Sequence, residues 1–458
     1  MRYASGGAAW ARYDMKRIYE DLAYSGVPDR DNFWRGTVES PPDCDPQTGD
    51  ARCDVAIIGG GFTGLNAALT LAQAGRDVIV IEAEHPGWGA SGRNGGFCCL
   101  GGGKASAAAL TSRFGEEGAR AWFHAERAAI EHVRDLLYTH GIDADTHSEG
   151  ETLLAHTKRA VADLHDYAEE MRHFHGVACT FHPAEALAEE GMNSPALHGG
   201  MSAPLGFALN PARYVQGLAR AARQAGARIF CGAPVTATAR MPDGGHRLTT
   251  ARGDILAAQM VVATNGYSSD DIPAWLAGRY LPSQSHVIVT RQLSEDELAA
   301  QGWTSDRMCY DTRNLLHYFR LMPDRRMLFG MRGSLRVTRA SLARAAAATR
   351  ADFDRFFPAW RHVETPWAWS GLVCLARGLM PYVGPVPDLP GAWASLAYHG
   401  NGVAMGSYCG HLLAGQILGT GPETPAALRA PLRRFELGRW RRLSLPLAYG
   451  WYAVRDRL

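Results

Sequence analysis

The fold is decided by the stretch DVAIIGGGFTGLNAALTLAQAGRDVIVIE, which occupies residues 54–82. Its apolar run Val55–Ile58 is typical of a buried strand. Apolar residues then recur every three or four positions across Phe62–Ala74, which predicts a helix. A second apolar run, Val78–Ile81, predicts another buried strand. The stretch therefore predicts a strand–helix–strand unit in an α/β protein.

The turn between the first strand and the helix carries Gly59, Gly61 and Gly64. Gly59 permits a tight turn, Gly61 lets a pyrophosphate approach the backbone, and Gly64 lets the helix pack closely on the sheet. The helix N-terminus offers free N–H groups to phosphates. The second strand ends in Glu82, 23 residues after Gly59, where a carboxylate can bind ribose hydroxyls. The unit predicts a dinucleotide site; the alternative is a glycine-rich turn that binds nothing.

The length and the charge of the chain exclude some classes of function. A chain of 458 residues suggests more than one domain and can bury a large core. Its 47 basic and 46 acidic residues predict no general attraction to nucleic acid or to an anionic membrane. Residues 55–75 and 389–422 are free of charge, but their clustered glycines favour strand–turn–helix elements over transmembrane spans. The lysines are Lys16, Lys104 and Lys158.

The chain has nine cysteines, an odd number, and no two of them form a C-x-x-C pair. This pattern predicts neither a disulfide framework nor a zinc ribbon, and it favours a reducing compartment. The first 22 residues lack the apolar core of a signal peptide. We therefore expect a cytoplasmic protein, and no histidine or cysteine spacing predicts a metal site.

Three further segments indicate which dinucleotide binds. The loop HPGWGASGRNGGFCCLGGGK, residues 85–104, is rich in small residues and backbone donors, and could follow a ribityl chain to a flavin ring. A predicted strand ends at VVATNG, residues 261–266. The motif YHGNG, residues 398–402, opens a helix whose N-terminus could favour negative charge on a reduced flavin. These segments favour FAD over a nicotinamide cofactor.

The motifs also resemble a known family. GWGASGRNGG at 87–96, LHYFRLMPDRRMLFG at 316–330, WSGLVCLARGLMPYVGPVPD at 369–388 and the ending WYAVRDRL are similar to sequences of the D-amino-acid-oxidase-type FAD-dependent oxidoreductases. Within that superfamily, the chain most resembles bacterial γ-glutamylputrescine oxidase-like proteins. The resemblance implies an α/β (α+β) protein, in which a Rossmann-like FAD-binding domain is interleaved with a mixed β-sheet substrate domain.

The resemblance also implies the layout of the chain. We expect an N-terminal extension over 1–49 and a helical, basic tail over 425–458. The FAD-binding domain is expected at 50–145, 205–275 and 375–424. The substrate domain is expected at 146–204 and 276–374.

By match to the family motifs, FAD would be held along its whole length. The ADP half would contact the glycine-rich turn and Glu82, and the flavin would lie along the GRNGG loop and the C-terminal glycine motif. The expected cofactor-binding residues are Gly59, Gly61, Phe62, Thr63, Gly64, Glu82, Ala83, Gly89, Ala90, Ser91, Arg93, Asn94, Gly95, Gly96, Val235, Ala263, Thr264, Asn265, Gly266, Gly400, Asn401, Gly402 and Val403. Cys374 lies near a position where some relatives bind FAD covalently, although the register does not match cleanly.

Five residues are candidates for the chemistry. Lys104 could activate oxygen, or it could be a solvated loop lysine. Tyr318 and Arg320 share one face of a predicted strand, with His317 on the opposite face, and Arg332 could join them from the partner strand. These three could clamp a substrate carboxylate, or form a salt bridge at the sheet edge. His399 could act as a general acid–base, or be structural.

The resemblance implies hydride transfer from a C–H bond next to an amine nitrogen to flavin N5. The imine would then be hydrolysed and O2 would reoxidise the flavin to give H2O2. The partners would be a small amine or amino acid and O2 or another acceptor. Two alternatives stay open: a dehydrogenase of the same fold that passes electrons to a quinone or carrier, and a non-catalytic flavin-binding subunit.

Overall fold

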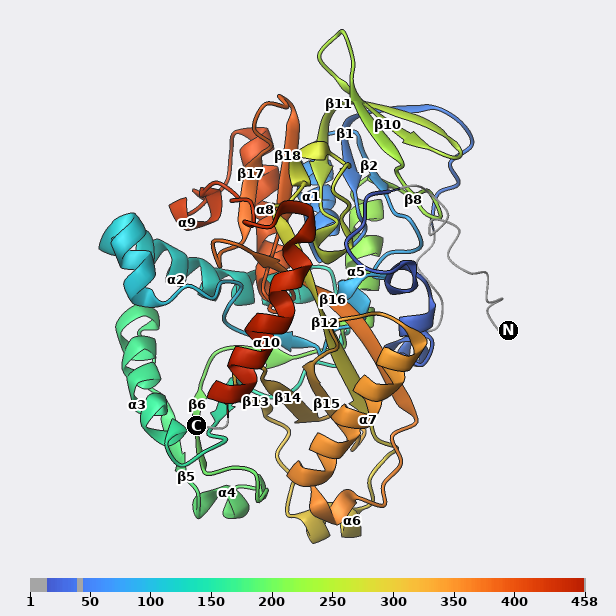
Figure 1. The fold of residues 1–458 in the computed structure, drawn as a ribbon. Coiled ribbons are helices and arrows are strands. Elements are labelled where there is room, and N and C mark those ends of the chain that lie inside the picture. Colours follow the sequence, from blue (N-terminus) through green and yellow to red (C-terminus); the bar gives the residue numbers. More distant parts are fainter. Residues whose placement is uncertain (1–14, 39–43, 457–458) are drawn as a thin grey trace.

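Two large β-sheets organise the computed structural model, which describes residues 15–38 and 44–456 (Figure 1). The first sheet has β1 at its centre, and the last four residues of β1 are buried because the sheet is covered on both faces. Its strand order is β17-β18-β11-β1-β2-β8, parallel from β18 to β8, with β10 and β9 added antiparallel beside β11. The strands are β1 (Ala51–Ile58), β2 (Val78–Ile81), β8 (Arg228–Phe230), β9 (Ala237–Arg240), β10 (His246–Thr250), β11 (Gly253–Val262), β17 (Tyr382–Pro385) and β18 (Ala392–Leu396).

The helices on this sheet surround the predicted glycine-rich unit. α1 (Phe62–Gln73) packs between α5 (Pro211–Gln224) and α8 (Ala404–Leu418), and α2 (Ala107–Thr139) crosses against α8. The strand–helix–strand prediction is confirmed by β1, α1 and β2. α2 begins at Ala107, where the side chain of Ser106 caps it, and the kink at Gly115 (φ 73°) does not end it.

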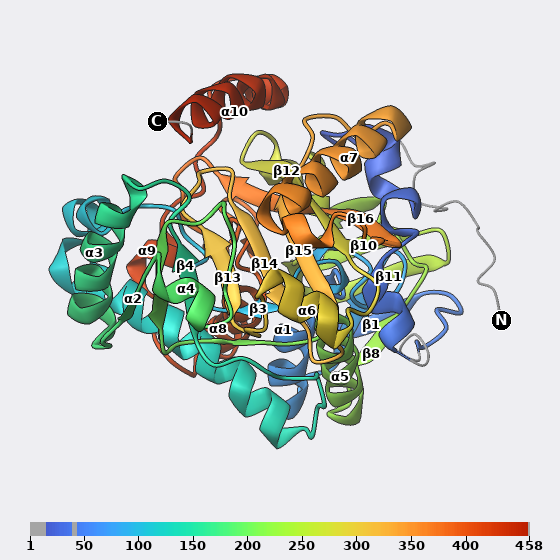
Figure 2. The same ribbon diagram turned by 90° about the horizontal axis from the view of Figure 1, so that it is seen from below.

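The second sheet is mixed, with the order β16-β12-β15-β14-β13-β4-β6-β5, and β13–β4 is its parallel pair. α7 (Arg339–Phe356) packs against it, as seen from below in Figure 2. The strands are β4 (Glu151–Leu154), β5 (Thr180–Pro183), β6 (Gly199–Ala203), β12 (Tyr280–Val289), β13 (Met308–Asp311), β14 (His317–Leu321), β15 (Met327–Arg332) and β16 (Trp367–Ala376); a small ribbon pairs β3 (Phe97–Cys98) with β7 (Phe207–Ala208). The remaining helices are α3 (Ala160–Glu170), α4 (Ala186–Glu189), α6 (Glu295–Gln301), α9 (Ala426–Arg429) and α10 (Ser444–Arg455). The fold class expected from the sequence is confirmed.

Residues 15–38 contact the loop that carries the GRNGG motif. The Nδ2 group of Asn32 donates to the carbonyl of Gly92 (2.9 Å), and the indole N–H of Trp34 donates to the carbonyl of Asn94 (2.9 Å). The Arg93 side chain lies 3.4 Å from Asp29. The N-terminal segment therefore holds the GRNGG loop in place.

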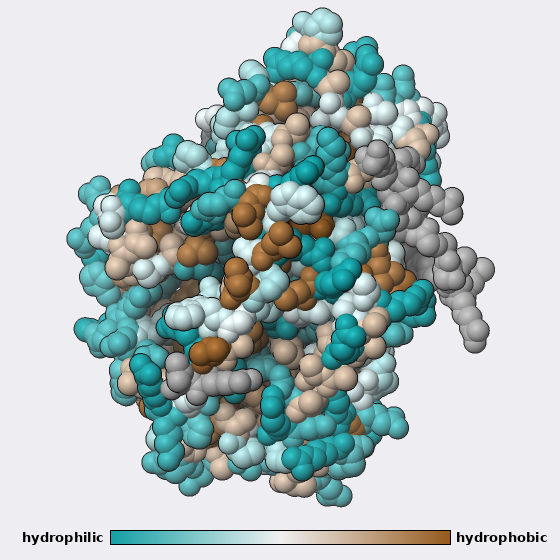
Figure 3. All heavy atoms as spheres, in the orientation of Figure 1, coloured by the Kyte–Doolittle hydropathy of each residue, from teal (hydrophilic) through white to brown (hydrophobic). Residues whose placement is uncertain are grey.

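The two ends of the described chain also meet. Glu20 accepts two hydrogen bonds from Arg442, both of 3.0 Å. The tail around Arg442 is helical, as expected, but it is not only a solvated basic surface. Hydrophobic side chains gather over α10 in Figure 3, where Leu447 is 79% and Trp451 63% exposed.

One disulfide departs from the prediction made for the cysteines. Cys44 and Cys231 are bonded, which ties the segment before β1 to the end of β8. The other seven cysteines are free. A sequence separation of 187 residues hid this pair, because only the fold brings the two side chains together.

Within residues 15–38 and 44–456, no helix combines the length and the apolar character needed to cross a bilayer.

Candidate functional site

Two adjoining cavities lie where the first sheet meets the second. The cavity over the glycine-rich turn, here the cradle cavity, has a volume of about 190 Å³. The inner cavity has a volume of about 370 Å³ and reaches from the cradle to α2 and α3. Both are lined by Ala90, Asn94, Leu372, Val373, Gly400 and Val403. One elongated ligand could therefore occupy the cradle and present one end to the inner cavity.

The three glycines of the turn have no room for a side chain. A Cβ on Gly59 would lie 2.8 Å from the carbonyl oxygen of Ala263, and φ there is +109°. On Gly61 it would lie 2.8 Å from Oγ of Ser91, and on Gly64 2.0 Å from the carbonyl oxygen of Gly59. The first two glycines keep the cradle open, and Gly64 brings α1 against β1.

The cradle offers polar groups suited to a dinucleotide. Oε2 of Glu82 accepts from the Gly60 N–H (2.7 Å) and Oε1 from the Glu84 N–H (3.0 Å), which hold the carboxylate at the cavity wall. Burial raises the pKa of Glu82, and these N–H bonds oppose that shift. The N-terminus of α1 lies at the cavity wall, where the Phe62 N–H donates to the Ser91 hydroxyl (2.9 Å) and the positive end of the helix dipole favours an anion. Ribose hydroxyls and phosphates fit these groups.

The GRNGG loop is rigid because its own side chains bind it. Asn94 accepts from the Gly96 N–H (2.8 Å) and donates to the carbonyls of Ala90 and Ser91. The Arg93 guanidinium lies 4.2 Å from the Trp88 ring centre and donates to the Trp88 carbonyl (2.7 Å). Arg93 is therefore held mainly by protein, although it also lines the inner cavity.

Nearly all of the expected cofactor-binding residues line one of the two cavities; the exceptions are Gly64, Gly96 and Gly266. Gly96 has φ +75°, and a Cβ there would lie 1.9 Å from the Leu209 carbonyl oxygen. A Cβ on Gly266 would lie 3.1 Å from the Leu372 carbonyl oxygen. These three glycines allow close backbone packing behind the cavities instead of contacting a ligand.

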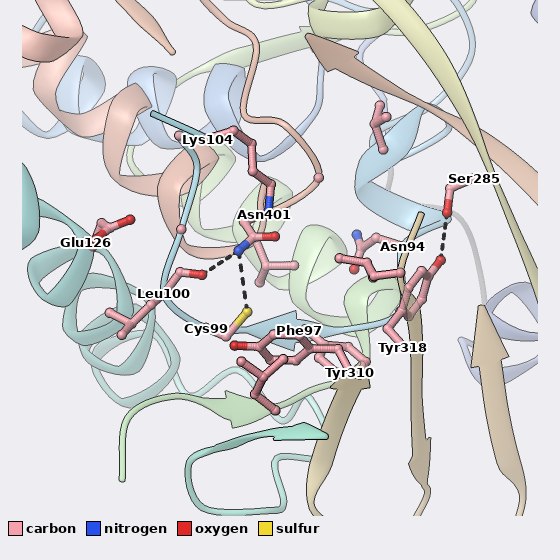
Figure 4. Close-up of a pocket in the computed structure, with 18 of the residues that line it drawn as sticks. Asn94, Phe97, Cys99, Leu100, Lys104, Glu126, Ser285, Tyr310, Tyr318 and Asn401 are labelled. Carbon is pink, nitrogen blue, oxygen red and sulfur yellow. Dashed lines mark hydrogen bonds between the residues drawn. The ribbon is translucent and has the colours of Figure 1, made fainter. Parts of the chain in front are cut away.

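Lys104 projects into the inner cavity, as does Asn401 (Figure 4). Neighbouring residues surround Lys104, but the residue is still exposed, and it lines the inner cavity. Burial and the nearby positive charge of Arg332 lower the pKa of Lys104. Its exposure leaves both the oxygen role and the solvated alternative as predictions.

Tyr318 and Arg332 also line the inner cavity. The Tyr318 hydroxyl is 2.9 Å from the hydroxyl of Ser285, and Nη2 of Arg332 donates to the His399 carbonyl (3.1 Å). A Cβ on Gly400 would lie 3.2 Å from Nη2 of Arg332, so Arg332 stands at the cradle end of the cavity.

The prediction that Arg320 clamps a substrate is wrong. Arg320 is 1% exposed and lines neither cavity. Its Nε donates to the Gly95 carbonyl (2.9 Å), its Nη2 to the Leu209 carbonyl (2.8 Å), and its Nη1 lies 2.7 Å from Nε2 of His147. Arg320 thus fastens the second sheet to the GRNGG loop. His317 does lie on the opposite face, bonded to Asp311 and Asp352.

The acid–base role considered for His399 is also not supported. The ring lines neither cavity, and its Nε2 accepts a hydrogen bond from the Ala376 N–H (3.3 Å). Burial, with Lys104 and Arg332, lowers its pKa to about 3, so it is uncharged at neutral pH. The structural alternative for this histidine agrees with the geometry.

Sequence reasoning missed a carboxyl group that lines the far end of the inner cavity and a second one that is buried outside the lining. Glu126 on α2 lines the cavity and is 7% exposed, and Glu151 on β4 is 3% exposed. The sequence does contain a signal: Glu126 lies three residues after Phe123 and four before Ile130, a spacing that places the three side chains on one face of a helix. A carboxyl group on such a face merits attention.

Cys374 lines the cradle cavity, and burial raises the pKa of its thiol to about 12. A thiol that stays protonated is a poor nucleophile. Its surroundings therefore give no support to a covalent bond with a cofactor.

The parallel sheet, the glycine turn and the carboxylate after β2 are those of a dinucleotide-binding protein, with a second cavity beside the cradle. The chain belongs to the family described as FAD dependent oxidoreductase (DAO), which it matches over residues 54–416. Its cofactor is accordingly FAD, and the cradle fits that molecule.

Similar proteins agree with this assignment. The chain is 31% identical to "Probable oxidoreductase OrdL" of Rhizobium meliloti, over 93% of this chain and 97% of that protein. It is 29% identical to "Gamma-glutamylputrescine oxidoreductase" of Escherichia coli, over 89% of this chain and 93% of that protein. The crystal structure of glycine oxidase from Geobacillus kaustophilus superposes with a TM-score of 0.69 at 21% identity, covering 84% of this chain and 100% of that one. This last likeness shows a shared fold.

Proposed function

We propose that the protein oxidises the C–N bond of a small amine or amino acid to an imine, which water hydrolyses to a carbonyl compound and an amine or ammonia. The observation that carries this proposal is the inner cavity, which adjoins the cradle at Gly400 and is lined by Lys104, Tyr318 and Arg332. A bound FAD would supply the acceptor for the hydride of the C–H bond beside the nitrogen; the electron pair, with that hydrogen and the proton lost from the nitrogen, would then reduce O2 to H2O2.

The residues of the chain bind and orient the substrate and favour its neutral form. Lys104 and Arg332 place positive charge at the cradle end of the cavity, which favours the neutral, oxidisable form of an amine there. The hydroxyl of Tyr318 and the guanidinium of Arg332 are placed to hold an oxygen or carboxylate of the substrate. Lys104 would stabilise negative charge as oxygen is reduced.

The two sheets support the proposed division of the chain into FAD-binding and substrate segments with the boundaries given above. We also keep the cytoplasmic location as a proposal. The fraction of the Cys44–Cys231 bond that forms in cells, measured after rapid alkylation and mass spectrometry, tests it: full oxidation would argue for another compartment.

The test of function is anaerobic bleaching of the bound flavin by polyamines, N-methyl amino acids and D-amino acids. Bleaching by at least one of them supports the proposal, and no bleaching by any amine would favour a non-catalytic flavin-binding subunit. Mixing the reduced protein with dissolved oxygen then separates an oxidase from a dehydrogenase, because only the oxidase reoxidises within its turnover time.

A further inference from the structure

The helical tail carries apolar side chains along its outer side. Trp440, Leu443, Leu447, Trp451 and Val454 are each more than half exposed. From Leu443 onward these residues are spaced by four, four and three positions, which places their side chains on one face of the helix. Figure 3 shows hydrophobic side chains gathered over α10. We call these five residues the tail stripe, and a contiguous apolar surface of this kind indicates an interaction site.

The opposite face of α10 fastens the helix to the rest of the protein. Leu445 is buried, and the Tyr449 hydroxyl lies 2.6 Å from the hydroxyl of Ser283 on β12. At the C-terminal end of the helix, the Asp456 carboxylate accepts a hydrogen bond from the Leu315 N–H (3.0 Å). Because α10 is held on this side, the tail stripe is presented outward, and no other element of the described chain buries it.

The tail is basic, although the whole chain is nearly neutral. Residues 425–458 contain eight arginines and two acidic residues. One acid, Glu436, pairs with Arg377 (2.7 Å), and the other, Asp456, is bound at the end of α10. Within the described residues, neither acid forms an ion pair with an arginine of the tail. The arginines on the surface of the tail therefore keep their positive charge.

An exposed arginine stands at each end of the tail stripe. The Arg439 guanidinium lies 4.9 Å from the ring centre of Trp440, so positive charge and aromatic surface are presented together. Arg455 follows Val454 directly and is also exposed. Tryptophan and leucine on one side of a helix, with arginines beside them, are typical of helices that lie at the surface of a membrane.

We propose that the tail stripe docks the protein on the surface of an anionic lipid bilayer. The apolar side chains would enter the boundary between headgroups and acyl chains, and Arg439 and Arg455 would bind lipid phosphates. The contact is with the surface only, since the described part of the chain has no helix able to cross a bilayer. The cytoplasmic leaflet is anionic, which matches the location proposed above.

A second copy of the chain is a poorer occupant of the tail stripe. A two-fold dimer brings the same patch of both copies together. Antiparallel pairing of two α10 helices would set Arg439 of one copy near Arg455 of the other. Juxtaposed like charges disfavour that pairing, whereas lipid phosphates neutralise both arginines.

The experiment is flotation of the FAD-loaded whole chain with vesicles of phosphatidylcholine alone, or of phosphatidylcholine and phosphatidylglycerol in equal parts. We expect binding to the anionic vesicles, at least roughly 10-fold weaker binding to the neutral ones, and weakening of the anionic binding at about 0.5 M salt. Flavin absorbance of each variant shows that it is folded and loaded.

Two kinds of substitution separate the apolar and the charged contributions. Leu447→Ser combined with Trp451→Ser should weaken binding about 10-fold or more, because both side chains lose the apolar surface that enters the lipid. Tyr138→Ser, which alters an exposed aromatic residue on α2, is the matched control and should bind normally. Arg439→Gln and Arg455→Gln should each weaken binding to the anionic vesicles about 5-fold and leave binding to the neutral vesicles unchanged.

Absence of vesicle binding, or equal binding to both kinds of vesicle, would overturn the inference. An equal loss in Tyr138→Ser and in the double variant would also overturn it. Sedimentation velocity without vesicles tests the other occupant. A dimer that the double variant dissociates, in a protein that does not bind vesicles, would assign the tail stripe to a second copy of the chain.

Discussion

Replacing Glu126 by glutamine should make the stability of this protein less sensitive to pH. The carboxyl group of Glu126 is buried at the cavity wall, which raises its pKa from the ordinary 4.5 to about 8. Between those values the folded state binds a proton that the unfolded state has lost. Stability therefore falls as the pH rises through this window. Glutamine has no proton to lose and removes this contribution.

The size of the effect follows from the two pKa values. With a folded pKa of about 8 and an unfolded pKa of 4.5, this group destabilises the folded state by about 2.5 kcal/mol more at pH 7 than at pH 5. Glu151, whose pKa burial also raises to about 8, remains in both proteins, and its charge is the second cause that raises the pKa of Glu126. Glu126→Gln should thus be more stable than the unaltered protein at pH 7 and gain much less at pH 5.

The assay is urea unfolding of the FAD-loaded protein, followed by far-ultraviolet circular dichroism at pH 5, 6, 7 and 8. The matched control is Glu131→Gln, because the Glu131 side chain is 58% exposed on the same helix. Parallel pH profiles for Glu126→Gln and the unaltered protein would refute the reasoning. A steeper decline for the variant would refute it more strongly.

Four other substitutions or treatments test the site. Lys104→Met should slow reoxidation by O2 about 10-fold or more while anaerobic reduction is little changed, and an unaltered reoxidation rate in stopped flow would exclude the oxygen role. Arg320→Met should cost about 3 kcal/mol in urea unfolding and weaken FAD retention, because two buried carbonyls lose a charged donor; full retention of both would contradict the fastening role. Gly64→Ala should prevent FAD loading because of the 2.0 Å approach to Gly59, whereas Gly450→Ala, with open space around it, should load normally in a flavin absorbance assay. Acid precipitation should release the flavin into the supernatant, since Cys374 stays protonated; yellow colour in the pellet would show a covalent bond.

The parts of this protein that sequence could predict are those encoded locally. The glycines at 59, 61 and 64 lie within one strand–helix turn, so their spacing alone predicts both the turn and the class of ligand. The strand that carries Tyr318 and Arg320, and its partner strand with Arg332, are likewise predicted by local alternation and pair as β14 and β15. Both are confirmed because each depends on contacts within a short segment.

The parts that could not be predicted depend on contacts distant in sequence. Alternation placed Arg320 beside Tyr318, but only the fold shows that the carbonyls of Gly95 and Leu209 occupy its donors. Burial of His399 and the Cys44–Cys231 bond depend in the same way on segments far along the chain. Glu126 is an intermediate case, because the sequence alone places it on an apolar helix face but does not show the cavity that it lines.

The bond between Glu20 and Arg442 has a consequence for how the protein is made. The two residues are 422 positions apart, and a ribosome adds about 5–20 residues per second. Arg442 is therefore synthesised tens of seconds after Glu20. During that interval the N-terminal segment, whose Asn32 and Trp34 hold the GRNGG loop, lacks its C-terminal anchor. The last step in assembling the flavin site is thus coupled to completion of the chain, so a nascent or C-terminally truncated protein should capture FAD poorly even with every cradle residue present.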